Sequence, residues 1–182
     1  PVGNGDTVRV RTETASFEAG RVVVAAGAWL PEFLGRQARA DWQRDFSVHR
    51  QVMHWFDTGA AAADFAPGRF PVFIWMFGDG PEDYMYGFPS SDPAQPALKV
   101  ATEQYVEATT PDDIDRSVRP EESAAMFRER VAGRFPRIEG RALKARACMY
   151  TVTPDRRFVI DALDGLPGVL VVSACSCLLY TS

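Results

Sequence analysis

The stretch ACMYTVTPDRRFVID, residues 147–161, decides how the rest of the chain is interpreted. Cys148 and Tyr150 alternate with their neighbours, and this period of two predicts a strand with two different faces. The Pro-Asp pair at 154–155 predicts a turn, because proline fixes its own φ and aspartate bonds the backbone near it. Residues 158–161 then predict a short buried strand, so the stretch is expected to form a hairpin. The thiol is either an ordinary buried cysteine or a reactive group.

The composition is that of an ordinary globular protein. The chain has 182 residues, of which 46% are hydrophobic and 24% charged, enough for one domain or for parts of two. The net charge of -4, with lysine and arginine scattered, argues against a nucleic acid or an anionic membrane as partner. No apolar run approaches the roughly 18 residues of a membrane span. Three cysteines without metal spacing argue against a disulfide scaffold and a metal site, and predict a reducing, cytoplasmic location.

Residues 21–29, RVVVAAGAW, predict a buried central strand that ends in small residues. Two interpretations of Gly27 stay open. The glycine either permits a tight turn from strand to helix, or lets a cofactor approach the backbone at the carboxyl end of a strand. A short helix is expected at 30–39 and a final buried strand at 168–174.

The middle of the chain predicts an antiparallel sheet. Strand patterns separated by short turn-forming segments occur at 48–56, 70–77, 83–89 and 97–103. So many aromatic residues predict that one face packs on a core and that the other lines a pocket for an apolar ligand. Residues 120–135 predict a helix that covers this sheet, with proline and glutamates at its start and arginines towards its end. The fold class is therefore predicted as α+β, with an α/β remnant.

Several motifs occur in the order found in a known enzyme group. They are the residues at 22–29, 50–52, 86–89 (YGFP), 99–101 (KVA), 148–151 (CMYT), 154–155 and 158–161. Together they resemble the monomeric sarcosine oxidase and N-methyl-L-tryptophan oxidase group of FAD-dependent amine oxidases, within the glycine oxidase/D-amino acid oxidase fold family. The likeness covers nearly all of residues 6–176. It implies an incomplete FAD-binding Rossmann-like domain and a substrate domain made of an antiparallel sheet covered by a helix.

The resemblance implies a flavin site. Cys148 matches the cysteine that carries FAD through a thioether, chemistry that needs a thiolate near an electrophilic methyl group. Lys99 matches a catalytic lysine that lies against the flavin and promotes the reduction of oxygen, as a fixed cation stabilises developing negative charge. Ala26, Gly27 and Trp29 match the strand end that touches the cofactor. A solvated lysine at a sheet edge remains the alternative for Lys99.

A substrate pocket is also implied. Tyr86 and Tyr150 match catalytic tyrosines beside the substrate, and Phe88 and Ile74 match residues lining the pocket. Core aromatic residues are the alternative for the tyrosines and the phenylalanine. Glu103 stands where sarcosine oxidase has a pocket histidine, so the resemblance does not specify sarcosine itself as the substrate.

The resemblance predicts a division of the chain. Residues 1–46 are expected to be the C-terminal part of the FAD-binding domain, 47–146 the substrate domain, and 147–176 a return to the FAD-binding domain. Residues 177–182 match nothing in the group. The Gly-x-Gly-x-x-Gly turn for FAD pyrophosphate is absent, and the chain starts without methionine, so a truncated fragment is expected.

The function expected from the resemblance is oxidation of N-methyl amino acids, such as sarcosine or N-methyltryptophan, to imines with reduction of O2 to H2O2. The expected partners are the small-molecule amine and O2, and the expected state is a monomer. A flavin dehydrogenase or deaminating amino-acid oxidase of the same fold is one alternative. An inactive fragment without cofactor is the other.

Overall fold

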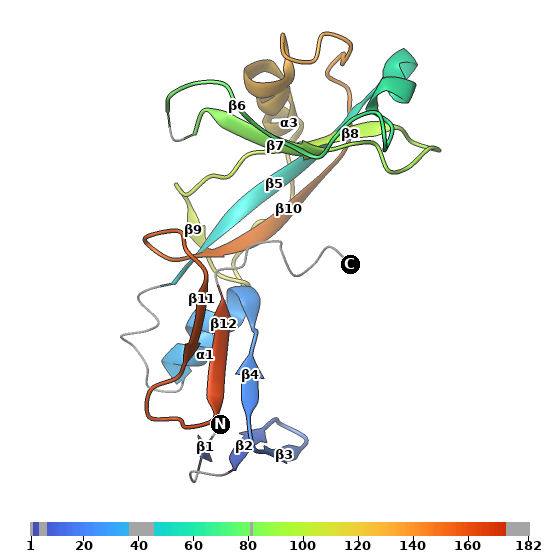
Figure 1. Cartoon of the computed structure of the whole chain (residues 1–182). Coiled ribbons are helices and arrows are strands. Elements are labelled where there is room, and N and C mark those ends of the chain that lie inside the picture. The colour runs from blue at the N-terminus through green and yellow to red at the C-terminus, as the bar shows by residue number, and fades with distance from the viewer. Residues whose placement is uncertain (1, 4–6, 37–45, 81, 174–182) are drawn as a thin grey trace. The chain divides into compact units, whose positions relative to one another are not determined.

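The computed structural model describes residues 2–3, 7–36, 46–80 and 82–173 (Figure 1). The chain divides into two compact units. The first draws on residues 1–49, 108–113 and 149–182, and the second on 50–107 and 114–148. Each unit has its own hydrophobic core, and the predicted unmatched tail at 177–182 lies outside the described residues.

The first unit contains a three-stranded sheet in which distant parts of the chain pair. The strand order is β11 (Val159–Ala162), β12 (Val169–Ser173) and β4 (Val22–Val24). β12 runs parallel to β4, with Leu170 opposite Val23, whereas β11 is antiparallel to β12. A parallel pair needs a long crossover connection, which is typical of α/β nucleotide-binding folds.

One face of this sheet is covered by the segment that follows β4. The segment forms a 3-10 turn, η1 (Gly27–Trp29), and the helix α1 (Leu30–Arg36). Its leucines pack with strand residues in a core made of Val8, Leu30, Leu34, Phe46, Leu163, Val169 and Val171. A separate small antiparallel sheet joins β1 (Val2–Gly3), β2 (Val8–Arg11) and β3 (Ser16–Ala19).

The strands of the first unit are more exposed than their sequences predict. Val23 is 61% exposed, Phe158 58% and Ile160 66%, so the predictions of a buried central strand at 21–29 and a buried strand at 158–161 are wrong for the described residues. In this part of the chain β4 and β11 form the two edges of the sheet, and the core cluster covers one face of it.

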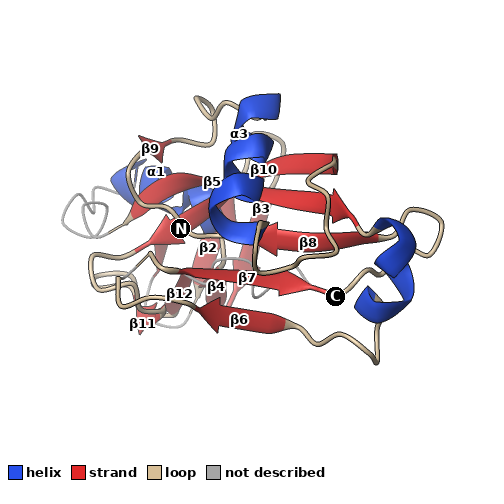
Figure 2. Ribbon diagram, turned by 90° about the horizontal axis from the view of Figure 1, so that it is seen from above, coloured by secondary structure: helices blue, strands red, loops and turns tan. Residues whose placement is uncertain are grey.

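The second sheet has six strands, in the order β10-β5-β8-β7-β6, with β9 also pairing with β5 (Figure 2). The strands are β5 (Ser47–Asp57), β6 (Phe73–Met76), β7 (Tyr84–Phe88), β8 (Ala97–Ala101), β9 (Ala108–Thr109) and β10 (Ala142–Val152). β6, β7 and β8 form an antiparallel meander, and β5, which precedes them in the chain, pairs antiparallel with β8. The predicted antiparallel sheet is confirmed, as is the separate sheet for β4.

β10 was expected to lead into a hairpin with residues 158–161, and this is wrong. β10 pairs with β5 in the second sheet, whereas β11 belongs to the sheet of the first unit. The expected turn between them is present. The Thr153 hydroxyl donates to Asp155 Oδ1 at 2.8 Å, and the Arg157 N–H donates to the Thr153 hydroxyl at 3.0 Å. The turn therefore redirects the chain from one sheet to another.

A helix covers one face of the second sheet, as predicted. It consists of α3 (Pro120–Met126) and a following π-helical turn, η3 (Phe127–Val131). The expected end at residue 135 is wrong, because η3 ends at Val131 and Gly133 takes a positive φ of 78°. Glycine has no Cβ and adopts this conformation without strain.

The core between α3 and the sheet is aromatic and aliphatic. Its buried members are Phe56, Ala61, Phe65, Met85, Leu98, Val100, Val131, Phe135 and Ile138. Phe65 comes from a 3-10 segment, η2 (Gly59–Phe65), which connects β5 to the meander. None of the helices in the described ranges is both long and apolar enough to cross a bilayer.

Candidate functional site

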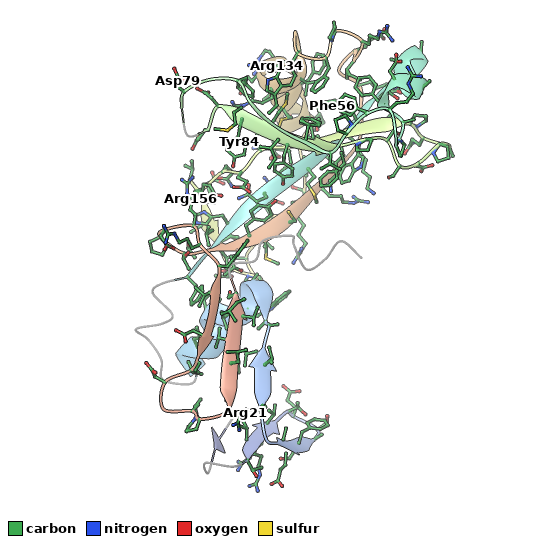
Figure 3. The ribbon with its side chains drawn as sticks, viewed as in Figure 1. Arg21, Phe56, Asp79, Tyr84, Arg134 and Arg156 are labelled. Atoms are coloured by element: carbon green, nitrogen blue, oxygen red, sulfur yellow. The ribbon has the colours of Figure 1, made fainter. Side chains whose placement is uncertain are left out.

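The second sheet has two faces of different character. Phe56, Leu98 and Met85 point into the core beneath α3, so the residues that alternate with them point to the other face. That other face is here called the aromatic face. It consists of Trp55 on β5, Lys99 and Ala101 on β8, Tyr84, Tyr86 and Phe88 on β7, Ile74 on β6, and Glu103 just after β8. Figure 3 shows Phe56 on the side of α3 and Tyr84 on the opposite side.

Lys99 is held between two rings on the aromatic face. It lies opposite Phe88 on the neighbouring strand, and its ammonium is 4.7 Å from the centre of the Phe88 ring. On the other side it lies opposite Trp55, 5.3 Å from the centre of the indole. A cation over an aromatic face is attracted to the ring quadrupole. The half-buried ammonium is thus fixed in place by its neighbours in the sheet.

Sequence reasoning missed Trp55 and a second lysine. The Lys144 ammonium, from β10, is 4.9 Å from the centre of the same indole. Trp55 belongs to the strand between β10 and β8, so one ring supports a cation from each neighbouring strand. The alternation of residues 48–56 indicates which face of the sheet Trp55 is on. It does not indicate which strands lie beside β5, and so which lysines contact the ring.

Tyr86 and Ile74 lie on the same face as Lys99. Tyr86 is opposite Ala101 on β8 and opposite Ile74 on β6. Tyr86 is half-buried, whereas Ile74, on the edge strand β6 of the described sheet, is 74% exposed. The structure therefore brings together Lys99, Phe88, Tyr86 and Ile74, four of the residues predicted from the sequence.

Lys99, Ala101 and Glu103 follow one another in a row beside Phe88, Tyr86 and Tyr84, and Glu103 lies at the end of this row away from Lys99. Its Oε2 accepts a hydrogen bond of 2.8 Å from the Tyr84 hydroxyl, and another from the Tyr105 hydroxyl. Glu103 is four residues beyond Lys99, so along an extended chain the two are about 13 Å apart. The tyrosines that hold Glu103 were not among the predicted site residues.

Cys148 is half-buried on β10, four residues after Lys144. The Asp57 N–H donates to the Arg141 carbonyl, while Trp55 meets Lys144, so residue numbers fall on β5 as they rise on β10. Cys148 and Lys144 share a face of β10, since they are an even number of residues apart. Tyr150, two residues further, is only 3% exposed and belongs to the first unit.

The predicted cofactor contacts at the end of β4 are in the first unit. Gly27 has a φ of +54°, which explains the glycine through the turn into η1. A Cβ built on Gly27 would have no atom within 4 Å, so the backbone is also open to a ligand. Trp29 is 50% exposed, and its N–H donates to the Ala26 carbonyl at 3.1 Å. Both interpretations of Gly27 are compatible with this geometry.

A buried histidine, His54 on β5, lies on the face of the second sheet opposite to the aromatic face. Burial lowers the pKa of His54 from 6.5 to about 4, although the nearby Glu122 carboxylate acts to raise it. His54 Nδ1 is 3.0 Å from the Ser123 hydroxyl of α3. His54 therefore connects β5 to α3 and is not a residue of the aromatic face.

Comparisons with known proteins show the family of the chain. A family model described as "DAO: FAD dependent oxidoreductase" matches residues 2–182. The chain is 38% identical over 168 residues to the monomeric sarcosine oxidase of Streptomyces avermitilis, which covers 92% of this chain and 42% of that protein. It is 26% identical over 170 residues to an N-methyl-L-tryptophan oxidase of Salmonella dublin, covering 93% and 42%.

The fold also matches a solved structure. NikD, described as an unusual amino acid oxidase essential for nikkomycin biosynthesis, matches with a TM-score of 0.69 at 17% identity, over 98% of this chain and 46% of that chain. The chain spans 42% of the length of the curated relatives named here. Because the family model matches residues 2–182, the chain belongs to the FAD-dependent oxidoreductase family.

Proposed function

We propose that this chain carries the substrate-binding sheet and part of the flavin site of an oxidase that acts on N-methyl amino acids. The substrates would be secondary amines such as sarcosine or N-methyltryptophan. The observation that carries the proposal is the Lys99 ammonium, held 4.7 Å and 5.3 Å from the Phe88 and Trp55 rings on the same face as Tyr86. Two relatives named as oxidases of N-methyl amines support it.

The residues present fit FAD. The aromatic face offers a fixed cation, and β10 offers the half-buried Cys148 thiol. The first unit offers an open backbone at Gly27, beside Ala26 and Trp29. When bound, FAD accepts two electrons from an amine and passes them to oxygen. We propose that Cys148 forms the thioether to FAD, which would keep the flavin colour with acid-precipitated protein.

The overall reaction balances without another reductant. The amine loses two electrons and two protons and becomes an imine, which water hydrolyses. Oxygen gains two electrons and two protons and becomes hydrogen peroxide. Lys99 would stabilise the negative charge that develops on oxygen, because a preorganised ammonium needs no reorientation during the reaction.

The remaining residues would shape the substrate site. Tyr86, Phe88 and Ile74 share the face that carries Lys99, and we propose that they contact the substrate. Tyr150 is proposed as a further residue beside the site. The odd cysteine count suggests a reducing cytoplasm, and we expect a monomer.

The test is Lys99→Met in the complete flavin-loaded protein. Loss of one well-placed charge costs about 100- to 1000-fold in rate, so flavin reoxidation by O2 should slow by that factor. Flavin reduction by the amine should change little, because methionine keeps the apolar stem of the side chain. Stopped-flow measurement of each half-reaction, with peroxide assayed per amine consumed, gives both quantities.

Lys144→Met is the matched control. It removes the other ammonium over Trp55 but leaves the one between Trp55 and Phe88, so reoxidation should slow much less. Equal slowing of both half-reactions in Lys99→Met would indicate a disturbed pocket and contradict the assigned role. Flavin reduction without peroxide in the unmodified protein would favour a dehydrogenase instead.

A further inference from the structure

Glu103 differs from the other half-buried carboxylates of the second unit. Each of the others faces an arginine, in the pairs Asp57–Arg141, Asp64–Arg137, Asp83–Arg130 and Glu122–Arg50. Glu103 makes no ion pair with any described residue, and its hydrogen bonds from this part of the chain come from two neutral phenols. A partly buried anion is costly unless a cation compensates it, so the aromatic face lacks a positive partner at this position.

The hydrogen bonds leave part of the carboxylate available. Tyr84 and Tyr105 both donate to Oε2. A carboxylate accepts about four hydrogen bonds. Among the residues that the structure describes, none donates to Oε1. The phenols therefore hold Glu103 in place while one oxygen remains able to accept a donor from a ligand.

Glu103 and Lys99 lie at opposite ends of one row of residues on the aromatic face. Phe88 pairs with Lys99 and Tyr86 with Ala101, and continuing this register places Tyr84 beside Glu103, as their hydrogen bond requires. The row thus has a cation at one end, a carboxylate at the other, and the small Ala101 between them. Such a row favours a ligand that carries positive charge towards Glu103.

We propose that Glu103 is a specificity-determining residue whose carboxylate binds a cationic group of the substrate. The inference rests on the proposed function, in which Tyr86 contacts the substrate, and it adds that the reacting amine lies near Tyr86, which is opposite Ala101 between Lys99 and Glu103. The cation would then be about 6–7 Å from the reacting amine. The substrate class is an N-alkyl amino acid whose side chain ends in an ammonium or guanidinium group.

Binding tests the site without any turnover. The ligands are 6-aminohexanoate and heptanoate, which differ only in a terminal ammonium or methyl group. Calorimetry on the flavin-loaded protein should show 6-aminohexanoate binding about 10- to 100-fold more tightly, the range for a hydrogen bond to a charged group. Glu103→Gln should abolish this preference, because glutamine keeps an oxygen for the phenols but has no charge. An Asp79→Asn control alters an exposed carboxylate, with the same change in net charge, and should keep the preference.

Turnover tests the substrate class. The ratio of kcat/KM for Nα-methyl-L-lysine to that for N-methyl-L-2-aminoheptanoate should exceed about 10 and fall to near one in Glu103→Gln. Equal binding of the two carboxylic acids, or a preference unchanged in Glu103→Gln, would overturn the inference. If neither amine reduces the flavin while 6-aminohexanoate still binds through Glu103, the proposed function fails and the cation site stands.

Discussion

Trp55 contributes to the site at the scale of a single side chain, through the two ammonium groups that its indole supports. Trp55→Leu removes the ring and should let Lys99 move from its fixed position. Cation–π contacts are worth about 0.5–2 kcal/mol, so flavin reoxidation should slow by about 2- to 30-fold in the complete protein. Stopped-flow mixing of the reduced protein with oxygen measures this rate.

Trp55→Phe serves as the conservative comparison. Phenylalanine retains an aromatic face for the ammonium, so it should restore most of the reoxidation rate. If Phe and Leu slow the reaction equally, the ring has no role in positioning Lys99.

Site residues could be predicted from the sequence where a local motif contains them, but not where they meet through the order of the strands. Lys99, Phe88 and Tyr86 carry motifs of a known group, and the register places all three on one face. Trp55 and Lys144 meet only because β5 lies between β8 and β10, and strand order is not written in any local pattern. Tyr84 was missed for the same reason, because its partner Glu103 comes from the segment that follows the neighbouring strand β8.

At the scale of elements, His54 makes the contact between β5 and α3 sensitive to acid. The folded protein has a His54 pKa of about 4, below the ordinary value of 6.5, so the unfolded chain binds a proton more readily. The stabilising contribution is complete above pH 6.5 and is lost as the pH falls towards 4. The free energy of unfolding should decrease by about 3 kcal/mol across this window.

Urea denaturation followed by tryptophan fluorescence between pH 7 and 4 measures this decrease. His54→Gln removes the titrating group and should flatten the pH dependence in this window, even if the variant is less stable at pH 7. The pKa of Asp57 is also lowered, by the hydrogen bond from the Gly59 N–H and then by Arg141. Its contribution to stability is lost only below pH 3.8, the ordinary pKa of aspartate, and so outside this window. Equal slopes in the two proteins would show that His54 is not responsible.

Element boundaries were predicted where the local chemistry is strong. Pro120 and the glutamates after it marked the start of α3, where Glu122 accepts a hydrogen bond from the Arg119 N–H. The end was misplaced, because the helical pattern continues past the π-helical turn that ends at Val131. Apolar residues at 158–161 predicted burial, but exposure depends on which strands lie alongside, as Ile160 on β11 illustrates.

At the scale of the whole molecule, the sequence predicted two separate sheets correctly, and a parallel pair joins residues that are far apart in the chain. The predicted borders of the domains depend on long-range packing. Two of the borders between the compact units fall inside strands, after His49 in β5 and after Cys148 in β10, where no turn or change in composition marks a border. A continuous strand gives no signal that one end serves a different core.

β6 ends the described second sheet, and its four residues, FIWM, carry no charge. Ile74 and Met76 are 74% and 75% exposed, and the outer backbone of this strand is a template on which another chain can add. Native proteins protect such edges with charged residues or proline, and here Pro71 stands only before the strand. We therefore expect aggregation on heating to begin at β6, with light scattering rising sooner than in an Ile74→Lys variant.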